Sequence, residues 1–292
     1  MRQALIETAR AKVNLTLRVL GRRPDGYHDL ESLVAFADFG DGIEFLPGAP
    51  PTVTVRGPFA TAIDGTNIAA LALQRVAAAA NAADATIELG AVTIEKRLPV
   101  AAGIGGGSAD AAAVLRAVRR ANPARAAAIE WHAVAASLGA DVPVCLHSAA
   151  QVMWGTGHDT VVVPPLPPLP AILVNPGVPL ATAGVFRALA AGPVPAVTVA
   201  PTPPGRFRDV AAVVAYMRAH ANDLEPTAVA LCPPIGAVLA ALRAQPAARI
   251  ARMSGSGPTC FALFDTPGDA AAAARRIGAS EPGWWVEATT FR

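Results

Sequence analysis

Hydrophobic and polar residues alternate in two stretches of the first hundred positions, which indicates strands with one buried face. In the first stretch, apolar residues occupy every second position: Val13, Leu15, Leu17 and Val19. This is the period of a β-strand. Lys12 and Asn14 then share the more polar face. A turn signal, Arg-Arg-Pro-Asp-Gly, follows at 22–26, and residues 86–95 alternate again.

Helical spacing predicts the elements between and after these strands. Asn67 can cap a helix that runs to about Ala80. Ser108 or Asp110 opens a second helix, which ends near Asn122. Further helices are expected up to Leu138, at 183–190, at 208–220 and before Met253, with a strand at 260–264. Helices and strands are therefore mixed along the chain.

The segment from Thr160 to Ala183 carries seven prolines and no charged residue. Its hydropathy is high, but prolines at this density forbid a membrane-spanning helix. We interpret the segment as a linker that runs into loops. A chain of 292 residues is long enough for one large domain or two, and we expect two.

Composition narrows the classes of partner. The net charge is +2 and Lys and Arg form no run, which argues against a nucleic-acid or anionic-membrane binder and favours small molecules. The cysteines, Cys145, Cys232 and Cys260, are odd in number and far apart, so neither a disulfide framework nor a zinc site is indicated. The first twelve residues lack a signal-peptide apolar stretch, so we expect a cytoplasmic protein.

Residues 98–112 read LPVAAGIGGGSADAA, a glycine run directly before a helix. Backbone N–H groups in such a loop can surround an anion, and the positive end of the helix dipole points to the same place. We therefore predict a phosphate-binding loop rather than a flexible surface loop. The chain contains no Gly-Lys pair, and Ser108 replaces the last glycine of GxGxxG, so neither common nucleotide fingerprint applies.

Four further features have both a functional and a structural interpretation. Lys12 is one of two lysines in an arginine-rich chain, which suits a confined site that needs a compact cation, although a strand edge could also carry it. Asp141 in LGADVP could be an N-cap or turn residue. Tyr27 and His28 could recognise a flat base or simply pack. The glycine-rich segment 253–258 could clasp a ligand or form a hairpin turn.

Three motifs in this order resemble those of the GHMP kinases: ARAKVNLTL at 9–17, LPVAAGIGGGSADAA at 98–112 and MSGSGPTCF at 253–261. Within that superfamily, GRRPDGYHDLESL at 21–33 and LGADVP at 138–143 are similar to the 4-diphosphocytidyl-2-C-methyl-D-erythritol kinases. The similarity extends from about residue 7 to 265. Ala101 and Ala102 stand where many relatives have glycine, which would stiffen the first half of the loop.

The resemblance implies an α+β, two-domain GHMP kinase fold. An ATP-binding N-terminal domain with a left-handed βαβ crossover would span 1–163, and a ferredoxin-like α/β substrate domain would span 164–292. It also implies ATP and Mg²⁺ as cofactors, the cytidylyl alcohol as the other small-molecule substrate, no nucleic-acid or membrane partner, and a monomer or weak homodimer.

The resemblance further assigns roles to individual residues. Asp141 would be the general base and Lys12 its electrostatic partner, and Ser108 would contact the metal. ATP would be bound by Asn67, Lys96, Pro99, Ala102, Gly103, Gly105, Gly106, Gly107 and Ser108. The cytidylyl substrate would be bound by Asn14, Tyr27, His28, Thr182 and Phe186.

Two alternatives remain open. Another GHMP-type kinase could act on mevalonate or homoserine, but these small acids give the ring of Tyr27 nothing to stack on. A non-catalytic nucleotide-binding homologue would need no proton acceptor, so the presence of both Lys12 and Asp141 argues against it.

Overall fold

The computed structural model describes residues 3–62, 67–194 and 200–292. The chain forms two compact units that interleave along the sequence. The first unit contains the chain up to Ala11, Phe39–Val100 and Gly105–Ser148, and the second contains Lys12–Asp38, Ala101–Ile104 and Ala149–Arg292. The domain boundary between residues 163 and 164 stays a prediction. Within the described ranges, no helix combines the length and the apolar character needed to cross a bilayer.

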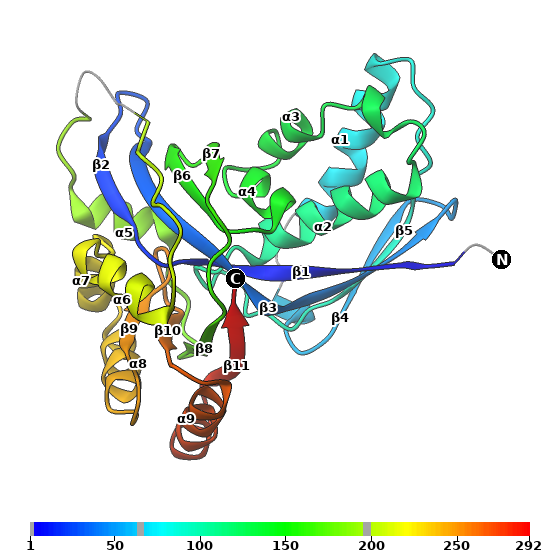
Figure 1. The fold of residues 1–292 in the computed structure, drawn as a ribbon. Coiled ribbons are helices and arrows are strands. Elements are labelled where there is room, and N and C mark those ends of the chain that lie inside the picture. Colours follow the sequence, from blue (N-terminus) through cyan, green and yellow to red (C-terminus); the bar gives the residue numbers. More distant parts are fainter. Residues whose placement is uncertain (1–2, 63–66, 195–199) are drawn as a thin grey trace. The chain divides into compact units, whose positions relative to one another are not determined.

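The first unit combines a sheet with a group of helices (Figure 1). Its strands are β1 (Leu5–Asn14) up to Ala11, the second part of β3 (His28–Pro47), β4 (Thr52–Arg56) and β5 (Gly90–Glu95). β3 pairs antiparallel with β5, whereas β4 pairs parallel with β5. Parallel neighbours need a crossover connection. Helix α1 (Ile68–Ala82) lies in this connection, which is the crossover that the resemblance implies to be left-handed.

The remaining helices of the first unit are α2 (Gly106–Ala121), α3 (Trp131–Ala136) and α4 (Val142–His147), with 3-10 turns at Ala60–Ala62 and Ala126–Ala128. The prediction that Asn67 caps α1 is confirmed, since its side chain accepts a hydrogen bond from the backbone N–H of Ala69 at 2.9 Å. Helix α2 packs on α1 and α4. Its buried face is dominated by alanines, which allow close approach between helices.

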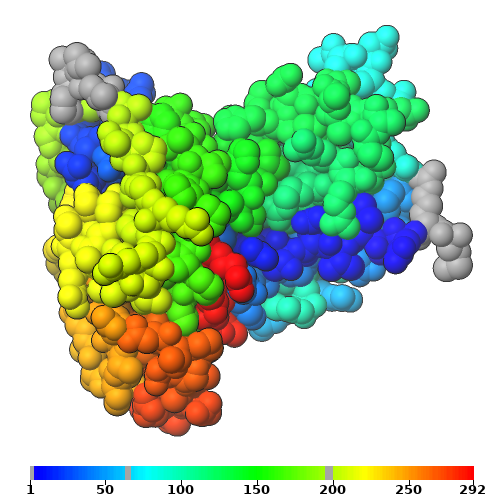
Figure 2. Space-filling view, in the orientation of Figure 1, coloured from blue at the N-terminus to red at the C-terminus, as the bar shows by residue number. Residues whose placement is uncertain are grey.

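The second unit contains the rest of the strands and helices. Its strands are β2 (Arg18–Arg22), the first part of β3, β6 (Gln151–Gly155), β7 (Asp159–Val162), β8 (Leu169–Asn175), β9 (Ile250–Met253), β10 (Cys260–Leu263) and β11 (Trp285–Phe291). Its helices are α5 (Thr182–Leu189), α6 (Val210–Ala219), α7 (Glu225–Leu231), α8 (Pro233–Arg243) and α9 (Pro267–Ser280). Helix α8 packs on β9 and β10, and α9 packs on β8 and β11. In Figure 2 the yellow to orange-red atoms of α6 to α9 cover part of the visible face of this unit.

The prediction of a linker from Thr160 to Ala183 was wrong. The segment contains β8, all of whose residues are buried, and β8 pairs antiparallel with both β10 and β11. Proline is rare in a central strand because it lacks an N–H donor. Here the carbonyl of Pro170 still accepts a hydrogen bond from the Phe264 N–H at 2.8 Å. A strand buried on both faces shows no alternation, which hides it from a period-two search.

Both predicted alternating strands have other bounds in the structure, where β1 already begins at Leu5. The first is interrupted between β1 and β2, where the N–H groups of Leu15 and Thr16 both donate to the carbonyl of Leu33. The second begins at β5 rather than at residue 86. Before β5, the side chain of Asn122 donates to the Glu88 carbonyl at 2.9 Å and accepts from the Glu88 N–H at 2.7 Å. The Asn122 side chain thus satisfies the backbone groups of Glu88 that a neighbouring strand would otherwise pair with.

Candidate active site

The first half of the glycine run is held by the turn between β9 and β10. Ser254 Oγ donates to the carbonyl of Gly103 at 3.0 Å, and the Thr259 N–H donates to the carbonyl of Ala102 at 3.2 Å. Gly103 has a φ of +73°, and a Cβ there would lie 2.6 Å from the Gly257 carbonyl oxygen. Only glycine fits this contact. The segment 253–258 therefore forms a hairpin turn and also anchors the loop.

Ala101, one of the departures from the family pattern, adopts a φ of +53°. This left-handed conformation is unfavourable for a residue with a Cβ and is usually taken by glycine. The alanine in this chain therefore stands in a position where the backbone geometry favours glycine.

The second half of the run opens helix α2 in the first unit. The prediction that Ser108 or Asp110 begins this helix was wrong, because α2 begins at Gly106 and its N-cap is Gly105, with a φ of +63°. Gly105 makes no side-chain capping bond, so the N–H groups of the first turn are left for another acceptor. Gly107 is exposed and Ser108 is half-buried within that turn.

Lys96 is held by two carboxylates beneath this turn. Its Nζ lies 2.5 Å from Asp41 Oδ2 and 2.6 Å from Asp110 Oδ2, and the three residues are at most 4% exposed. The other oxygen of Asp41 accepts from the N–H groups of Arg97 and Leu98. A Cβ on Gly106 would lie 3.3 Å from Lys96 Nζ, so the ammonium packs closely against the start of α2.

The charge balance of this cluster depends on Asp110. Burial lowers the pKa of Lys96, but the Asp110 and Asp41 carboxylates outweigh this effect and raise it above its ordinary value. Burial also raises the pKa of Asp110 to about 8, although the Lys96 ammonium opposes the shift. The carboxyl of Asp110 is therefore harder to ionise than an ordinary aspartate, in a cluster that holds one ammonium and two acids.

Neither Asp41 nor Asp110 was predicted from the sequence as a partner of Lys96. Asp110 did carry a signal, since an acid among the alanines of an apolar helix must find a buried cation or a proton. Asp41 is distant in sequence and only the tertiary structure brings it to Lys96. The Lys96 ammonium is already bound by the side chains of Asp41 and Asp110. Its role near the adenine of ATP stays a prediction.

Lys12 and Asn14 occupy buried positions in the second unit, 4% and 3% exposed. The interpretation of Lys12 as a solvated strand-edge residue is therefore wrong. The Lys12 N–H donates to the carbonyl of Ile104 at 3.0 Å, and the Asn14 N–H donates to Ser254 Oγ at 3.1 Å. Both residues are thus held by the part of the glycine run that lies in this unit or by the turn that anchors it.

Asp141 occupies the N-cap position of α4 in the first unit, but its side chain makes no capping hydrogen bond. Capping therefore does not account for the choice of an acid here. The pairing of Asp141 with Lys12 stays a prediction. Asn67 and Pro99 also lie in the first unit, where Asn67 is half-buried and Pro99 is buried, and their contacts with ATP stay predictions.

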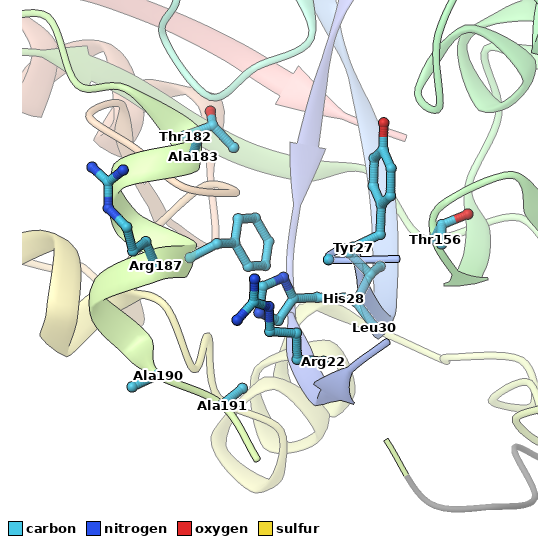
Figure 3. A pocket seen from close by; sticks show the side chains of 12 residues that line it. Arg22, Tyr27, His28, Leu30, Thr156, Thr182, Ala183, Arg187, Ala190 and Ala191 are labelled. Carbon is cyan, nitrogen blue, oxygen red and sulfur yellow. The ribbon is translucent and has the colours of Figure 1, made fainter. Parts of the chain in front are cut away.

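The second unit contains a pocket of about 840 Å³ that brings four of the predicted substrate residues together: Tyr27, His28, Thr182 and Phe186. The rings of His28 and Phe186 stack with centroids 4.8 Å apart, and Tyr27 is 68% exposed. Figure 3 shows Tyr27, His28 and Arg22 on the strand side, with Thr182 and Arg187 on α5 across from them. Thr182 Oγ1 lies 2.8 Å from Ser256 Oγ, which connects α5 to the β9–β10 turn.

The imidazole of His28 is suited to recognising a polar ring edge. Burial and the nearby Arg22 guanidinium lower the pKa of His28 below its ordinary value, which favours the neutral form of the ring. A neutral imidazole has one donor and one acceptor nitrogen. It can therefore hydrogen-bond to either a carbonyl or an amino group on a planar base.

Comparisons with known proteins agree with this geometry. The family models for the GHMP kinases N terminal domain and the GHMP kinases C terminal match residues 67–149 and 206–282. The chain is 48% identical to the 4-diphosphocytidyl-2-C-methyl-D-erythritol kinase of Bradyrhizobium sp. strain BTAi1, over 98% of this chain and 96% of that protein. It is also 48% identical to the kinase of the same name from Rhodopseudomonas palustris, over 97% of this chain and 96% of that protein.

Solved structures extend the comparison. A crystal structure of 4-(cytidine 5'-diphospho)-2C-methyl-D-erythritol kinase matches with a TM-score of 0.76 at 33% identity, covering 98% of this chain and 99% of that one. Homoserine kinase from Cytophaga hutchinsonii matches with a TM-score of 0.66 at 16% identity, covering 99% of this chain and 96% of that one, which shows the fold alone. The chain belongs to the ATP-dependent GHMP kinases, and among them to the family of the 4-diphosphocytidyl-2-C-methyl-D-erythritol kinases.

Proposed function

We propose that this protein transfers the γ-phosphoryl group of ATP to the 2-hydroxyl of 4-diphosphocytidyl-2-C-methyl-D-erythritol, in the methylerythritol phosphate route to isoprenoids. The observation that carries the proposal is the pocket that contains Tyr27, the stacked pair His28 and Phe186, and Thr182. Aromatic faces and a neutral imidazole suit a cytosine ring, which offers a flat surface and a polar edge.

The glycine run would bind the ATP phosphates. Gly103 in the segment held by the β9–β10 turn, and Gly105, Gly106 and Gly107 at the start of α2, would offer backbone N–H groups to the phosphate oxygens. The uncapped first turn of α2 supports this role. Because the anchoring contacts are made by the chain itself, they would limit the loop entropy lost on binding.

Mg²⁺ would enter with ATP. Within residues 3–62, 67–194 and 200–292, no cluster of three His, Cys, Asp or Glu side chains could hold a metal ion. This fits Mg²⁺ in kinases, which is carried largely by phosphate oxygens and water with few protein ligands. Ser108, half-buried in the first turn of α2, is the residue proposed to contact it, and the ion would neutralise phosphate charge.

The chemical step would depend on alignment and charge. The oxygen of the 2-hydroxyl would form a bond to the γ-phosphorus while the bond from that phosphorus to the leaving ADP oxygen breaks. Asp141 would take the hydroxyl proton, and the Lys12 ammonium would stabilise the negative charge on the transferring group. This requires both side chains to reach the acceptor hydroxyl. The buried position of Lys12 supports the assignment, and capping of α4 does not account for an acid at Asp141.

The test is to supply ATP and Mg²⁺ with each candidate acceptor and to follow ADP release. We expect turnover with 4-diphosphocytidyl-2-C-methyl-D-erythritol and background rates with mevalonate or homoserine. Faster turnover with either small acid would reassign the protein to another GHMP kinase. No turnover with any of the three would favour a nucleotide-binding homologue without kinase activity.

A further inference from the structure

Ser32, a residue of β3 to which no role has been assigned, is linked to Asn14 by a short hydrogen bond. Asn14 Nδ2 donates to Ser32 Oγ at 2.7 Å, and Ser32 Oγ donates to the backbone carbonyl of Thr16 at 2.5 Å. Ser32 is fully buried and Asn14 is 3% exposed. All three residues lie in the second unit.

This chain of bonds determines which way the Asn14 amide faces. A carbonyl oxygen can only accept, so the single hydroxyl proton of Ser32 must go to Thr16. Ser32 Oγ then has only lone pairs to offer Asn14, and the atom that faces it must be the NH₂ group. The amide oxygen, Oδ1, is therefore directed away from Ser32.

Asn14 Oδ1 is buried and has no hydrogen-bond partner among the described residues. An unmet buried acceptor is unfavourable by about 1–3 kcal/mol, so most are satisfied by protein, water or ligand. Gly255 lies beside this oxygen, and a Cβ there would come within 3.2 Å of it. The backbone of Asn14 is itself held by Ser254.

We propose that Ser32 is a positioning residue for the acceptor alcohol, because it locks the Asn14 amide with Oδ1 presented to a substrate hydroxyl. Without the Ser32 hydroxyl, the amide could rotate and present a donor instead of an acceptor. This rests on the proposed function, since it takes the cytidylyl polyol as the ligand.

The reacting 2-hydroxyl cannot be the partner of Asn14 Oδ1. The reacting 2-hydroxyl has one proton, and that proton goes to Asp141 in the proposed reaction. It is therefore not available to Asn14. The methylerythritol unit carries two more free hydroxyls beside it, at C1 and C3, because the 4-oxygen bears the diphosphate. Asn14 Oδ1 accepts a hydrogen bond from one of these two hydroxyls. The contact therefore requires a substrate with a second hydroxyl beside the one that reacts.

The experiment measures KM for both substrates in Ser32→Ala and Ser32→Thr. Ser32→Ala is expected to raise KM for the cytidylyl substrate about tenfold, the effect of about 1.4 kcal/mol, and to leave KM for ATP within about twofold. Ser32→Thr keeps the hydroxyl and should restore the normal value. If Ser32→Ala fails to fold, Ser32→Cys should give the same selective increase, because a thiol is a weak hydrogen-bonding group.

Thr16→Val is the matched control. Thr16 Oγ1 is also a buried hydroxyl at this place, but it accepts from the Leu33 N–H at 3.0 Å and does not touch the Asn14 amide. We expect it to lower thermal stability without a selective change in KM. An equal change for both substrates in Ser32→Ala, or the same selective increase in Thr16→Val, would overturn the proposal.

Substrate analogues give an independent readout. Either the 1-deoxy or the 3-deoxy form of the substrate should bind the wild-type protein about tenfold more weakly than the full substrate. The Ser32→Ala protein should bind that deoxy form and the full substrate with equal affinity. If the wild-type protein bound both deoxy analogues as tightly as the full substrate, the proposal would be contradicted. If the wild-type protein does not turn over the cytidylyl substrate at all, the proposed function itself fails, whereas normal turnover with an unselective Ser32→Ala defeats only the role of Ser32.

Discussion

Lys96 Nζ lies 2.6 Å from Asp110 Oδ2, in a site where neither side chain is more than 6% exposed. The contact joins the end of β5 to the first turns of α2, the helix that begins within the glycine run. Because Asp41 also binds Lys96, the cluster has one cation for two acids, and its net charge depends on whether Asp110 holds a proton.

The stability of the protein should therefore depend on pH through Asp110. Its pKa is raised from 3.8 to about 8, so between these values the folded state holds a proton that the unfolded state has lost. The contribution of Asp110 to the free energy of unfolding is then largest below pH 4 and declines as pH rises to about 8, by up to about 1.4 kcal/mol per pH unit.

Asp110→Asn tests this contribution because the amide has the same shape and does not titrate. Denaturant unfolding from pH 5 to 9 should show the variant gaining stability relative to the wild-type protein up to about pH 8, with a constant difference above it. Glu95→Gln, which breaks an exposed ion pair with Arg97, is the control and should give no such trend. A pH-independent difference for Asp110→Asn would show that Asp110 is ionised in the folded protein.

Asp141→Asn should leave the fold intact and reduce kcat at least about a hundredfold, the usual scale for a positioned general base. The side chain makes no capping bond to α4, so the substitution removes no helix cap. Asp84→Asn, at an exposed acid beyond α1, should keep the normal rate. A near-normal kcat for Asp141→Asn would remove this carboxylate from the chemistry.

Tyr27→Ala should raise KM for the cytidylyl substrate far more than KM for ATP. The ring is 68% exposed and lines the pocket of His28 and Phe186, so it contributes little to the core but offers a face for stacking. Tyr27→Phe keeps that face and should behave nearly normally in steady-state kinetics. Equal increases in both KM values for Tyr27→Ala would place the ring outside the cytidylyl site.

Ala101→Gly should stabilise the protein by roughly 1 kcal/mol, because Ala101 has a φ of +53° and glycine adopts this conformation without a steric penalty. Ala237→Gly, at an exposed position inside α8, is the matched control and should destabilise by about 1 kcal/mol. Thermal unfolding of the two variants compares the loss of the same methyl group from a left-handed residue and from a helical residue. If both melting temperatures shifted in the same direction, the strain at Ala101 would be contradicted.

Local signals in the sequence were sufficient for several elements. Asn67 caps α1 through a bond to a residue two positions away, and helices 183–190 and 208–220 correspond closely to α5 and α6. The glycine run was recognisable because its consequences are also local: positive φ values at Gly103 and Gly105, and a helix that starts immediately afterwards. The motifs around it were sufficient to predict the family.

The sequence by itself thus determined the fold class, the phosphate-loop candidate and the family, because these depend on short-range backbone preferences and on motifs read in order. Only the tertiary structure decided that β8 is a buried strand, that Asp41 and Asp110 share Lys96, and that Ser32 orients Asn14. The physical reason is that pairing in a sheet interior and the matching of buried polar groups depend on partners far away in the chain, which no local pattern specifies.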